Sequence, residues 1–384
     1  MKYCKRCVQP DTRPGISFNK EGVCPACLFA DQHENIDWEE RRRELEKIAE
    51  LGRRHNVSGY DCVVGVSGGK DSTRQAMYIR DELSLKPLLV SCTYPPEQLT
   101  ERGAHNLANL ISLGFDCITV SPDPVVWKTL MRQGFLKFGN WCKSTEMALY
   151  ASAPKVAIAY HIPLVFLGEN TAISLGDSLT GSVTGDANRM KYGNTIEGGN
   201  PDRLLVEGIS EQDVHLYRYP SDRDMELCQL KIYYLGYYIK DFNKVRNAEF
   251  SVEHGLEMRS EPPEDIGDIL GSTALDDDFV IMNQMFKQLK FGFGAVTDQV
   301  CEVVRLGMMS REEAIDQVKK YDGKCAPKYV KKFCDYIEID EEEFWRVADK
   351  YRNKDVWEKG EDGEWRIKIP FDSSAMLEPS RETR

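Results

Sequence analysis

The sequence predicts an α/β protein in which a parallel sheet carries a small cysteine-rich unit before it and a mainly helical module after it. Three observations support this prediction. Short apolar stretches alternate with helical patterns from Tyr60 onward, four cysteines form two close pairs near the start, and helical periodicity returns toward the end. Strands separated by helices indicate a parallel sheet that is covered on both faces.

The composition is that of a soluble globular protein. Of the 384 residues, 41% are hydrophobic and 29% are charged, and this length has room for two or three domains. The net charge of -12 disfavours broad nonspecific nucleic-acid binding, which needs a basic surface. No apolar run approaches the roughly 20 residues that span a bilayer, and the N-terminus lacks the apolar stretch of a signal peptide. We therefore expect a cytoplasmic protein without membrane insertion.

The segment 1–37 contains the cysteine-rich unit. Cys4 and Cys7 form one CxxC pair, and Cys24 and Cys27 form another after sixteen residues rich in turn formers. Two such pairs can supply four thiolates in a tetrahedron, which is the closed geometry of structural zinc. Four unrelated thiols are the plain alternative, and a redox CxxC would need a βαβ pattern that neither pair has. We predict a zinc ribbon.

A linking helix is predicted for residues 38–56, because apolar residues recur there at helical spacing among many Glu and Arg. The segment 57–217 then alternates strands with helices. Predicted strands span 61–66, 87–93, 116–120 and 163–168, and predicted helices span 71–84, 97–113, 124–137 and 144–160. Ligands on such sheets lie beyond the carboxyl ends of the strands, so site residues are expected there.

The end of the first strand is the most informative stretch of the chain. It reads Val66-Ser67-Gly68-Gly69-Lys70-Asp71-Ser72 and opens a helix. Two adjacent glycines let the backbone approach a ligand, and the N-terminus of the new helix favours an anion such as phosphate. The hydroxyls, the lysine and the carboxylate add hydrogen-bond donors, a cation and a ligand for Mg²⁺. An ordinary glycine-rich turn is the alternative, and the spacing excludes a Walker loop.

This stretch resembles the PP-loop signature SGGxDS of the ATP pyrophosphatase superfamily, whose members cleave ATP to AMP and pyrophosphate. The resemblance implies a sheet of the adenine nucleotide alpha hydrolase-like, Rossmann-like type, with ATP bound over residues 66–72. It also implies that Cys92 and Thr93, after the second strand, lie near the adenine. Gly168 and Glu169 end the fourth strand, and Glu169 matches an acidic residue that shares Mg²⁺ with the PP-loop aspartate. Lys70, Asp71 and Glu169 are then the expected catalytic residues, with a solvated strand-end carboxylate as the alternative for Glu169.

Two later segments are expected to complete the protein. Residues 168–200 are rich in Gly, Asn, Ser and Thr, and a loop of this length beside the strand ends predicts a lid. Residues 218–384 predict a helical module that closes over the sheet, with helical periodicity over 295–320 and 340–352. A capping box is predicted to begin at Ser310.

Several longer runs make the comparison with a family more specific. Besides the glycine loop, they are Tyr3-Cys4-x-x-Cys7, Asp11-Thr12-Arg13-Pro14, Cys24-Pro25-Ala26-Cys27, Leu167-Gly168-Glu169-Asn170, Tyr234-Leu235-Gly236-Tyr237-Tyr238, Lys290-Phe291-Gly292-Phe293-Gly294, Arg305-Leu306-Gly307 and Arg311-Glu312-Glu313-Ala314. With these runs, almost the whole chain resembles the N-acetyl sugar amidotransferases of surface-polysaccharide and nonulosonic-acid biosynthesis. The resemblance implies conversion of a sugar acetamido group to an acetamidino group, with ATP cleaved to AMP and pyrophosphate. Which N-acetyl sugar is used, and whether it is nucleotide-linked, stays open.

The nitrogen source follows from what the sequence lacks. A class II glutaminase needs a cysteine directly after the initiator methionine, where this chain has Lys2. A class I glutaminase places its cysteine between glycines on a tight turn, and none of the twelve cysteines has Gly on both sides. Ammonia is thus expected from solution or from a separate glutaminase. In the family it comes from partners that resemble the glutaminase and cyclase subunits of imidazole glycerol phosphate synthase.

A PP-loop tRNA thiolase is the main alternative, because such enzymes also join a PP-loop to zinc-binding CxxC pairs. The acidic charge, the lone Cys142 without a catalytic partner and the C-terminal runs weigh against it. A regulator that binds nucleotide without catalysis would need a defective loop, and this loop is intact. Cys142 is a candidate catalytic residue, although some relatives carry a second cysteine where this chain has Lys143. Lys143, Lys191 and Arg305 are candidates for holding a carboxylate or phosphate of the sugar, with ordinary surface cations as the alternative.

Overall fold

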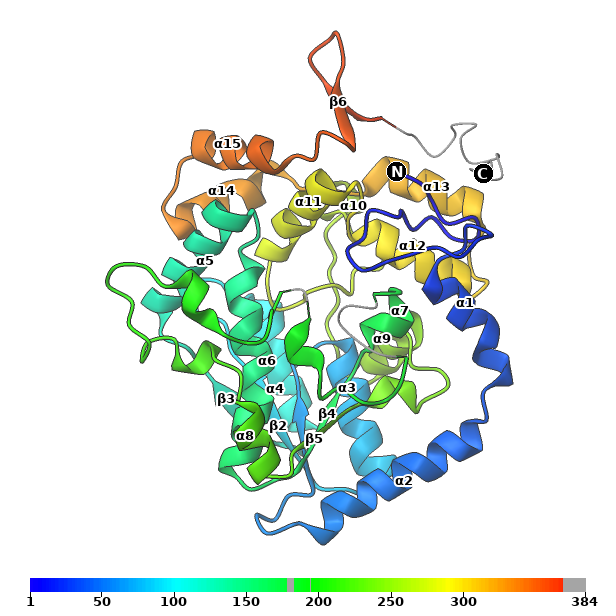
Figure 1. Cartoon of the computed structure of the whole chain (residues 1–384), viewed down its shortest axis with the longest axis vertical. Helices are drawn as coiled ribbons and strands as arrows, with labels where there is room; N and C mark the ends of the chain where they lie inside the picture. The colour runs from blue at the N-terminus through cyan, green and yellow to red at the C-terminus, as the bar shows by residue number, and fades with distance from the viewer. Residues whose placement is uncertain (178–182, 194, 369–384) are drawn as a thin grey trace, which may run out of the picture.

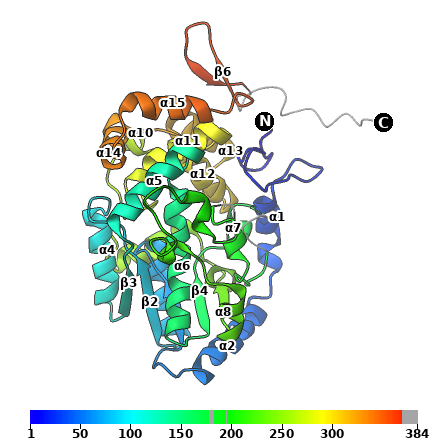
Figure 2. The same cartoon turned by 60° about the vertical axis from the view of Figure 1, so that its left-hand side comes forward.

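The fold is built on a five-stranded sheet in which all neighbouring strands are parallel (Figures 1 and 2). The computed structural model describes residues 1–177, 183–193 and 195–368. The strands are β1 (Cys62–Gly65), β2 (Pro87–Cys92), β3 (Asp116–Val120), β4 (Leu164–Leu167) and β5 (Lys231–Tyr234), in the order β3-β2-β1-β4-β5. The predicted α/β class with a parallel sheet is confirmed, and each of the four predicted strands contains an observed one.

Helices cover both faces of the sheet, as a parallel sheet requires. They include α2 (Trp38–Arg54), α3 (Lys70–Met77), α4 (Glu101–Ser112), α5 (Pro124–Phe138) and α6 (Cys142–Ala159). Val63 of β1 packs in a cluster with α6, whereas the next residue, Val64, packs in a cluster with α2, α3 and α4. Both faces of the strand are therefore buried, which explains its continuous apolar run. The predicted linking helix corresponds to α2, and the four predicted helices between the strands correspond to α3 through α6.

The fifth strand is a feature that the sequence analysis does not predict. β5 pairs with β4, with Leu164 opposite Lys231. It lies at the edge of the sheet, so Lys231 is exposed while Ile232 and Tyr234 are buried, and the apolar run of an inner strand is missing. β5 also lies beyond residue 217, so the sheet takes its last strand from the segment that the sequence analysis assigns to the C-terminal module.

The last five helices of the C-terminal segment lie together beyond the carboxyl ends of the strands (Figures 1 and 2). They are α11 (Phe279–Phe291), α12 (Ala295–Arg305), α13 (Arg311–Tyr321), α14 (Pro327–Ile337) and α15 (Glu341–Tyr351), followed by a hairpin of β6 (Trp357–Lys359) and β7 (Trp365–Ile367). The predicted periodicity over 295–320 forms two helices, because Gly307 adopts a φ of +71° and ends the first of them. The predicted capping box begins the second, with the side chains of Ser310 and Glu313 each accepting from the other's backbone N–H.

The N-terminal segment packs against this helical module. Val8 and Val23 lie in a cluster with Val296 and Val300 of α12. α1 (Pro25–Gln32), which follows the second cysteine pair, contacts α7 (Thr171–Ser174), the short helix after β4. The cysteine-rich unit therefore contacts both the C-terminal helices and the segment that leaves the fourth strand.

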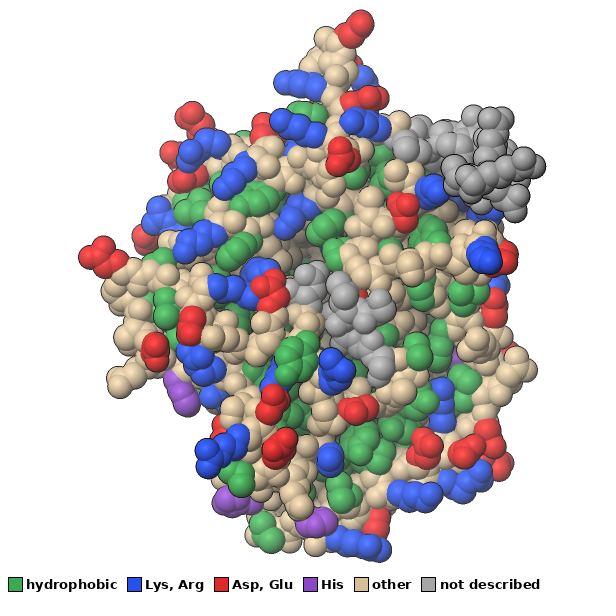
Figure 3. Space-filling view, viewed as in Figure 1, with side chains coloured by type: hydrophobic (Ala, Val, Ile, Leu, Met, Phe, Trp, Pro, Cys, Tyr) green, Lys and Arg blue, Asp and Glu red, His purple; other side chains and the backbone are tan. Residues whose placement is uncertain are grey.

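The surface carries charges of both signs. On the face shown in Figure 3, Lys and Arg are interspersed with Asp and Glu, and no broad basic area forms there. Within the described part of the chain, no helix combines the length and the apolar character that crossing a membrane requires.

Candidate active site and cysteine cluster

The order of the strands brings two loops together at the carboxyl edge of the sheet. β1 lies between β2 and β4, so the chain passes to opposite sides of β1 to form its two neighbours. Such a switch point is where open parallel sheets bind ligands. The glycine loop (residues 66–72) follows β1, while Gly168 and Glu169 follow β4. The two segments that the sequence marks as site segments are thus neighbours.

The glycine loop turns sharply into α3. Gly68 has a φ of +81°, and a Cβ at this position would lie 2.8 Å from the backbone N of Leu107, so glycine is required there. Gly69 is the N-cap of α3, and the hydroxyl of Ser72 accepts a hydrogen bond from the backbone N–H of Ser67 at 2.9 Å. Two hydroxyls and the N-terminus of a helix therefore meet at one place, an arrangement that suits an anion.

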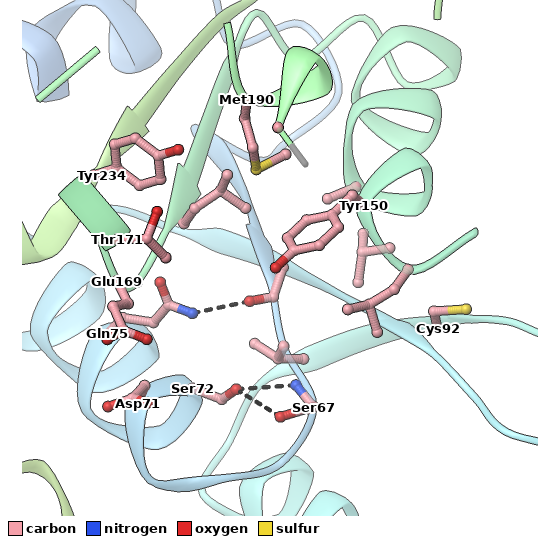
Figure 4. A pocket seen from close by; sticks show the side chains of 18 of the residues that line it. Ser67, Asp71, Ser72, Gln75, Cys92, Tyr150, Glu169, Thr171, Met190 and Tyr234 are labelled. Atoms are coloured by element: carbon pink, nitrogen blue, oxygen red, sulfur yellow. Dashed lines mark hydrogen bonds between the residues drawn. The ribbon is translucent and has the colours of Figure 1, made fainter. Parts of the chain in front are cut away.

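A cavity of about 270 Å³ opens beside this loop (Figure 4). The predicted site residues that line it are Val66, Ser67, Asp71, Ser72, Cys92, Gly168 and Glu169. Tyr150 of α6 and Tyr234 of β5 flank it with their hydroxyls toward its interior. Met190 and Ile196 form part of its wall, so the segment 168–200 borders the cavity as expected, although residues 178–182 and 194 of the predicted lid lie outside the described residues.

Asp71 is fixed at both of its carboxylate oxygens. Lys70 donates from Nζ to Oδ2 at 2.8 Å, and Asn247 donates from Nδ2 to Oδ1 at 2.7 Å. Burial opposes the ionisation of Asp71, but the two donors outweigh burial and hold the pKa of Asp71 below its usual value. Asp71 is therefore ionised at neutral pH, which is the form that binds a divalent cation.

A second cavity, of about 50 Å³, adjoins the first, and Asp71 and Glu169 line both of them. In the second cavity, Lys244 Nζ lies 3.1 Å from Glu169 Oε1 and 2.7 Å from Glu302 Oε2. Burial by itself lowers the pKa of Lys244, but the two carboxylates raise it above its usual value. Burial by itself raises the pKa of Glu302, but the neighbouring Lys244 lowers that pKa below its usual value. Both partners are thus charged, and one ammonium lies between two carboxylates.

Helix α9 (Lys244–Glu253) is the part of the site that the sequence analysis misses. Lys244, Asn247 and Ser251 lie at helical spacing on one face, and Ser251 donates to the carbonyl oxygen of Lys70 at 2.7 Å. The helical spacing of these three polar residues is a signal that the sequence contains, and the structure shows that Asn247 and Ser251 are fully buried. The sequence does not show which residue that face meets, because Asp71 lies 176 positions away from Asn247.

Two predicted residues, Thr93 and Cys142, line neither cavity and have different surroundings. The hydroxyl of Thr93, directly after β2, is buried and has no hydrogen-bond partner among the described residues. Cys142 lies in a hydrophobic cluster with Trp141 and Met147, and burial raises the pKa of its thiol well above the usual value. A protonated, buried thiol is a poor nucleophile and a poor metal ligand. The surroundings of Cys142 are those of a packing residue.

The three cations predicted to hold the sugar each have a partner within the protein. Lys143 pairs with Glu197, Lys191 pairs with Asp222, and Arg305 donates to the carbonyl oxygen of Ser174 at 2.6 Å. In the described part of the chain, none of the three lines either cavity. Their role in substrate binding stays a prediction.

The four cysteines of the N-terminal segment form a compact cluster. The Sγ atoms of Cys4, Cys7, Cys24 and Cys27 all lie within 4.8 Å of one another, and all four residues are buried. The Sγ–Sγ distance is 3.9 Å for Cys4 and Cys27 and 3.7 Å for Cys7 and Cys24. A tetrahedral zinc ion with Zn–S bonds of about 2.3 Å separates its sulfur ligands by about 3.8 Å. The cluster therefore fits the predicted zinc ion, with no open position for catalysis.

Helix α12 connects the cysteine cluster to the cavities. Cys301 packs in the same hydrophobic cluster as the four cysteines, and Glu302 beside it pairs with Lys244. One turn later, Arg305 bonds to Ser174 of α7, five residues after Glu169. Helix α12 therefore contacts both the cysteine cluster and residues close to Glu169.

Part of the chain is similar to a known protein family. Residues 273–369 match a family model described as LPS biosynthesis protein WbpG-like, C-terminal domain. No curated protein matches the chain at a significant level. The matched segment includes α11 through α15 and contributes Glu302 to the second cavity. The C-terminal module is therefore similar to that of a family of lipopolysaccharide biosynthesis proteins.

Proposed function

We propose that this chain is an ATP-dependent amidotransferase that converts the N-acetyl group of a sugar to an acetamidino group, with release of AMP and pyrophosphate. The observation that carries the proposal is the convergence of the glycine loop, Asp71 and Glu169 on one cavity at the switch point of the sheet. The match of residues 273–369 with a lipopolysaccharide biosynthesis family supports a sugar as the substrate.

In this proposal the glycine loop holds the phosphates of ATP. The hydroxyls of Ser67 and Ser72 lie 3.4 Å apart at the start of α3, where the backbone N–H groups favour an anion. Lys70 adds a positive charge. Cys92 lines the cavity, and we place the adenine beside it and the next residue, Thr93. The hydroxyls of Tyr150 and Tyr234 point into the rest of the cavity, where the sugar would bind.

Asp71 and Glu169 are the residues that would hold Mg²⁺. Both are carboxylates, both line the two adjoining cavities, and oxygen ligands are those that Mg²⁺ prefers. A divalent cation bound there supplies charge neutralisation on the phosphate oxygens. Asp71 is fixed in advance by Lys70 and Asn247, so it needs little rearrangement to serve as a ligand.

Adenylation solves the chemical problem of the reaction. An N-acetyl amide is a poor electrophile, because direct attack by ammonia would have to expel oxide. When the amide oxygen attacks the α-phosphorus of ATP, pyrophosphate leaves and an O-adenylyl imidate forms. Ammonia then adds to the imidate carbon, the nitrogen loses a proton, and AMP leaves to give the amidine. Donors of the glycine loop stabilise the charge that develops on the phosphorus.

Ammonia reaches the proposed enzyme from solution or from a separate partner. None of the twelve cysteines has glycine on both sides, as the tight turn of a class I glutaminase requires, so the chain alone should use ammonium salts and not glutamine. Partners that resemble the glutaminase and cyclase subunits of imidazole glycerol phosphate synthase would supply ammonia in the cell.

The test is a reaction of the purified chain with ATP, Mg²⁺, labelled ammonium and a panel of free and nucleotide-linked N-acetyl sugars. Mass spectrometry should find a product in which NH replaces one oxygen, together with equal amounts of AMP and pyrophosphate and no ADP. The Asp71→Asn chain, purified identically, should form about two to three orders of magnitude less of each product and so controls for contaminants. ADP as product, glutaminase activity of the isolated chain, or sulfur incorporated into tRNA would decide against the proposal.

A further inference from the structure

The side-chain amide of Asn247 is buried beside the two carboxylates that are proposed to hold Mg²⁺. It is fully buried, it lines the smaller cavity together with Asp71 and Glu169, and its N–H holds Asp71 at 2.7 Å. Its carbonyl oxygen has no hydrogen-bond partner within the described residues. A buried oxygen without a partner is unfavourable unless a ligand meets it. An amide oxygen is also a usual ligand for hard divalent cations.

Lys244, one turn earlier on α9, reaches the other carboxylate. Its Nζ lies 3.1 Å from Glu169 and 2.7 Å from Glu302, and its backbone N–H donates to Glu302 at 2.7 Å. The contacts with Glu302 are shorter and more numerous than the single contact with Glu169. Lys244 can therefore release Glu169 and still keep a counter-ion, so that no buried charge is left alone.

We propose that Asn247 completes a divalent-cation site with Asp71 and Glu169, and that Lys244 is the resident counter-ion that the cation displaces from Glu169. The inference rests on the proposed function, in which the two carboxylates hold Mg²⁺. It assigns opposite effects to two residues of one helix. Asn247 favours cation binding because it fixes Asp71 and adds an oxygen, whereas Lys244 competes with the cation for Glu169.

Binding of Mn²⁺ to the full chain, followed by electron paramagnetic resonance without ATP or sugar, tests this assignment. Asn247→Leu keeps the size of the side chain and removes its polar atoms, so the affinity for Mn²⁺ should fall about tenfold, the scale of a hydrogen bond to a charged group. Lys244→Met combined with Glu302→Gln leaves the net charge unchanged, and the glutamine keeps an oxygen for the backbone N–H of residue 244. In this double variant the affinity for Mn²⁺ should rise several-fold.

Asn109→Leu is the matched control, because Asn109 donates to the carbonyl oxygen of His254 at 2.8 Å and so anchors the end of α9 without touching a carboxylate. It should leave the affinity for Mn²⁺ unchanged. Unaltered affinity in Asn247→Leu, or no Mn²⁺ binding by the original chain at millimolar concentration, would overturn the site. A lowered or unchanged affinity in the double variant would overturn the role of Lys244. Since no ATP or sugar is present, these outcomes are independent of whether amidation is observed.

Discussion

The cysteine cluster and the cavities differ in how their residues are brought together. All four thiols come from one short segment, in which Cys4 and Cys7 have the same spacing as Cys24 and Cys27. Asp71, Glu169 and Lys244 come from three segments far apart in the chain. Local spacing fixes the cluster, whereas the cavities form only once the sheet has placed β4 beside β1 and α9 beside α3.

The two regions also differ in how their polar atoms are satisfied. In the cluster the thiols face one another, and backbone N–H groups donate to the Sγ atoms of Cys4 and Cys7. In the cavities, buried side-chain oxygens of Gln75 and Asn247 have no partner within the described residues. A buried oxygen without a partner is unfavourable, and a ligand can supply the missing donor or cation. The cluster is thus suited to stability and the cavities to binding, and four predictions test this division.

The largest effect is expected from Asp71→Asn, which keeps the shape of the side chain and removes its charge. Release of pyrophosphate should fall by about two to three orders of magnitude, the usual scale for losing a key electrostatic element. The matched control is Asp241→Asn, which removes the charge of an exposed carboxylate. Asp241 pairs with Arg74, which lies on α3 together with Asp71. A pyrophosphate assay with both variants makes the measurement, and near-normal turnover of Asp71→Asn would mean that this carboxylate is only structural.

Replacing both Cys4 and Cys7 with Ser should affect stability rather than chemistry. Metal analysis should find about one zinc per chain in the original protein and none in the variant, because two thiolates cannot close the tetrahedral site. The free energy of unfolding should fall by several kcal/mol, since zinc binding contributes to folding. Cys228→Ser, outside the cluster, should keep its zinc. Absence of zinc from freshly purified protein would contradict the cluster's assignment.

Gly68→Ala tests whether the glycine loop must approach α4 as closely as it does. The added Cβ would lie 2.8 Å from the backbone N of Leu107, so the loop has to move. We expect the affinity for an ATP analogue to fall about tenfold, as for strain of about 1–3 kcal/mol. Gly59→Ala is the control, because Gly59 also has a positive φ, +87°, but nothing lies within 4 Å of its Cβ position. Equal analogue affinity in both variants would show that the close approach is irrelevant to binding.

The comparison of the two regions also explains how much the sequence could predict. The zinc ligands, the four predicted strands and the glycine loop depend on local spacing and apolar runs, and the structure has the strands and the cysteine cluster where they are expected. β5 is not predicted because an edge strand with Lys231 and two tyrosines lacks an apolar run. Asn247 and Lys244 are not predicted because their partners lie on other elements, which only the folded chain identifies.

The candidate sugar-binding cations also show what the sequence cannot predict. Charge is the only feature that marks Lys143, Lys191 and Arg305 in the sequence, and charge alone does not distinguish a ligand-binding cation from one with a partner in the protein. In the structure Lys143 pairs with Glu197 and Lys191 pairs with Asp222. No local sequence pattern connects the two residues of either pair. Residue type and approximate position are therefore readable from sequence, whereas the partner of a long charged side chain is not.

The smallest effect is expected from Arg305→Met, which tests the connection between the two regions. Arg305 bonds to the carbonyl oxygen of Ser174, so its loss should loosen α7 and, through it, Glu169. We expect the affinity for an ATP analogue to fall only about two- to threefold, because one hydrogen bond acts on the site indirectly. Zinc content and the KM for the sugar should not change, and hydrogen exchange should quicken at residues 171–174. If Arg305 instead holds an anionic group of the sugar, the KM for the sugar should rise strongly and the analogue affinity should stay constant. Arg346→Met, at an exposed arginine that pairs with Glu343, should change none of these quantities.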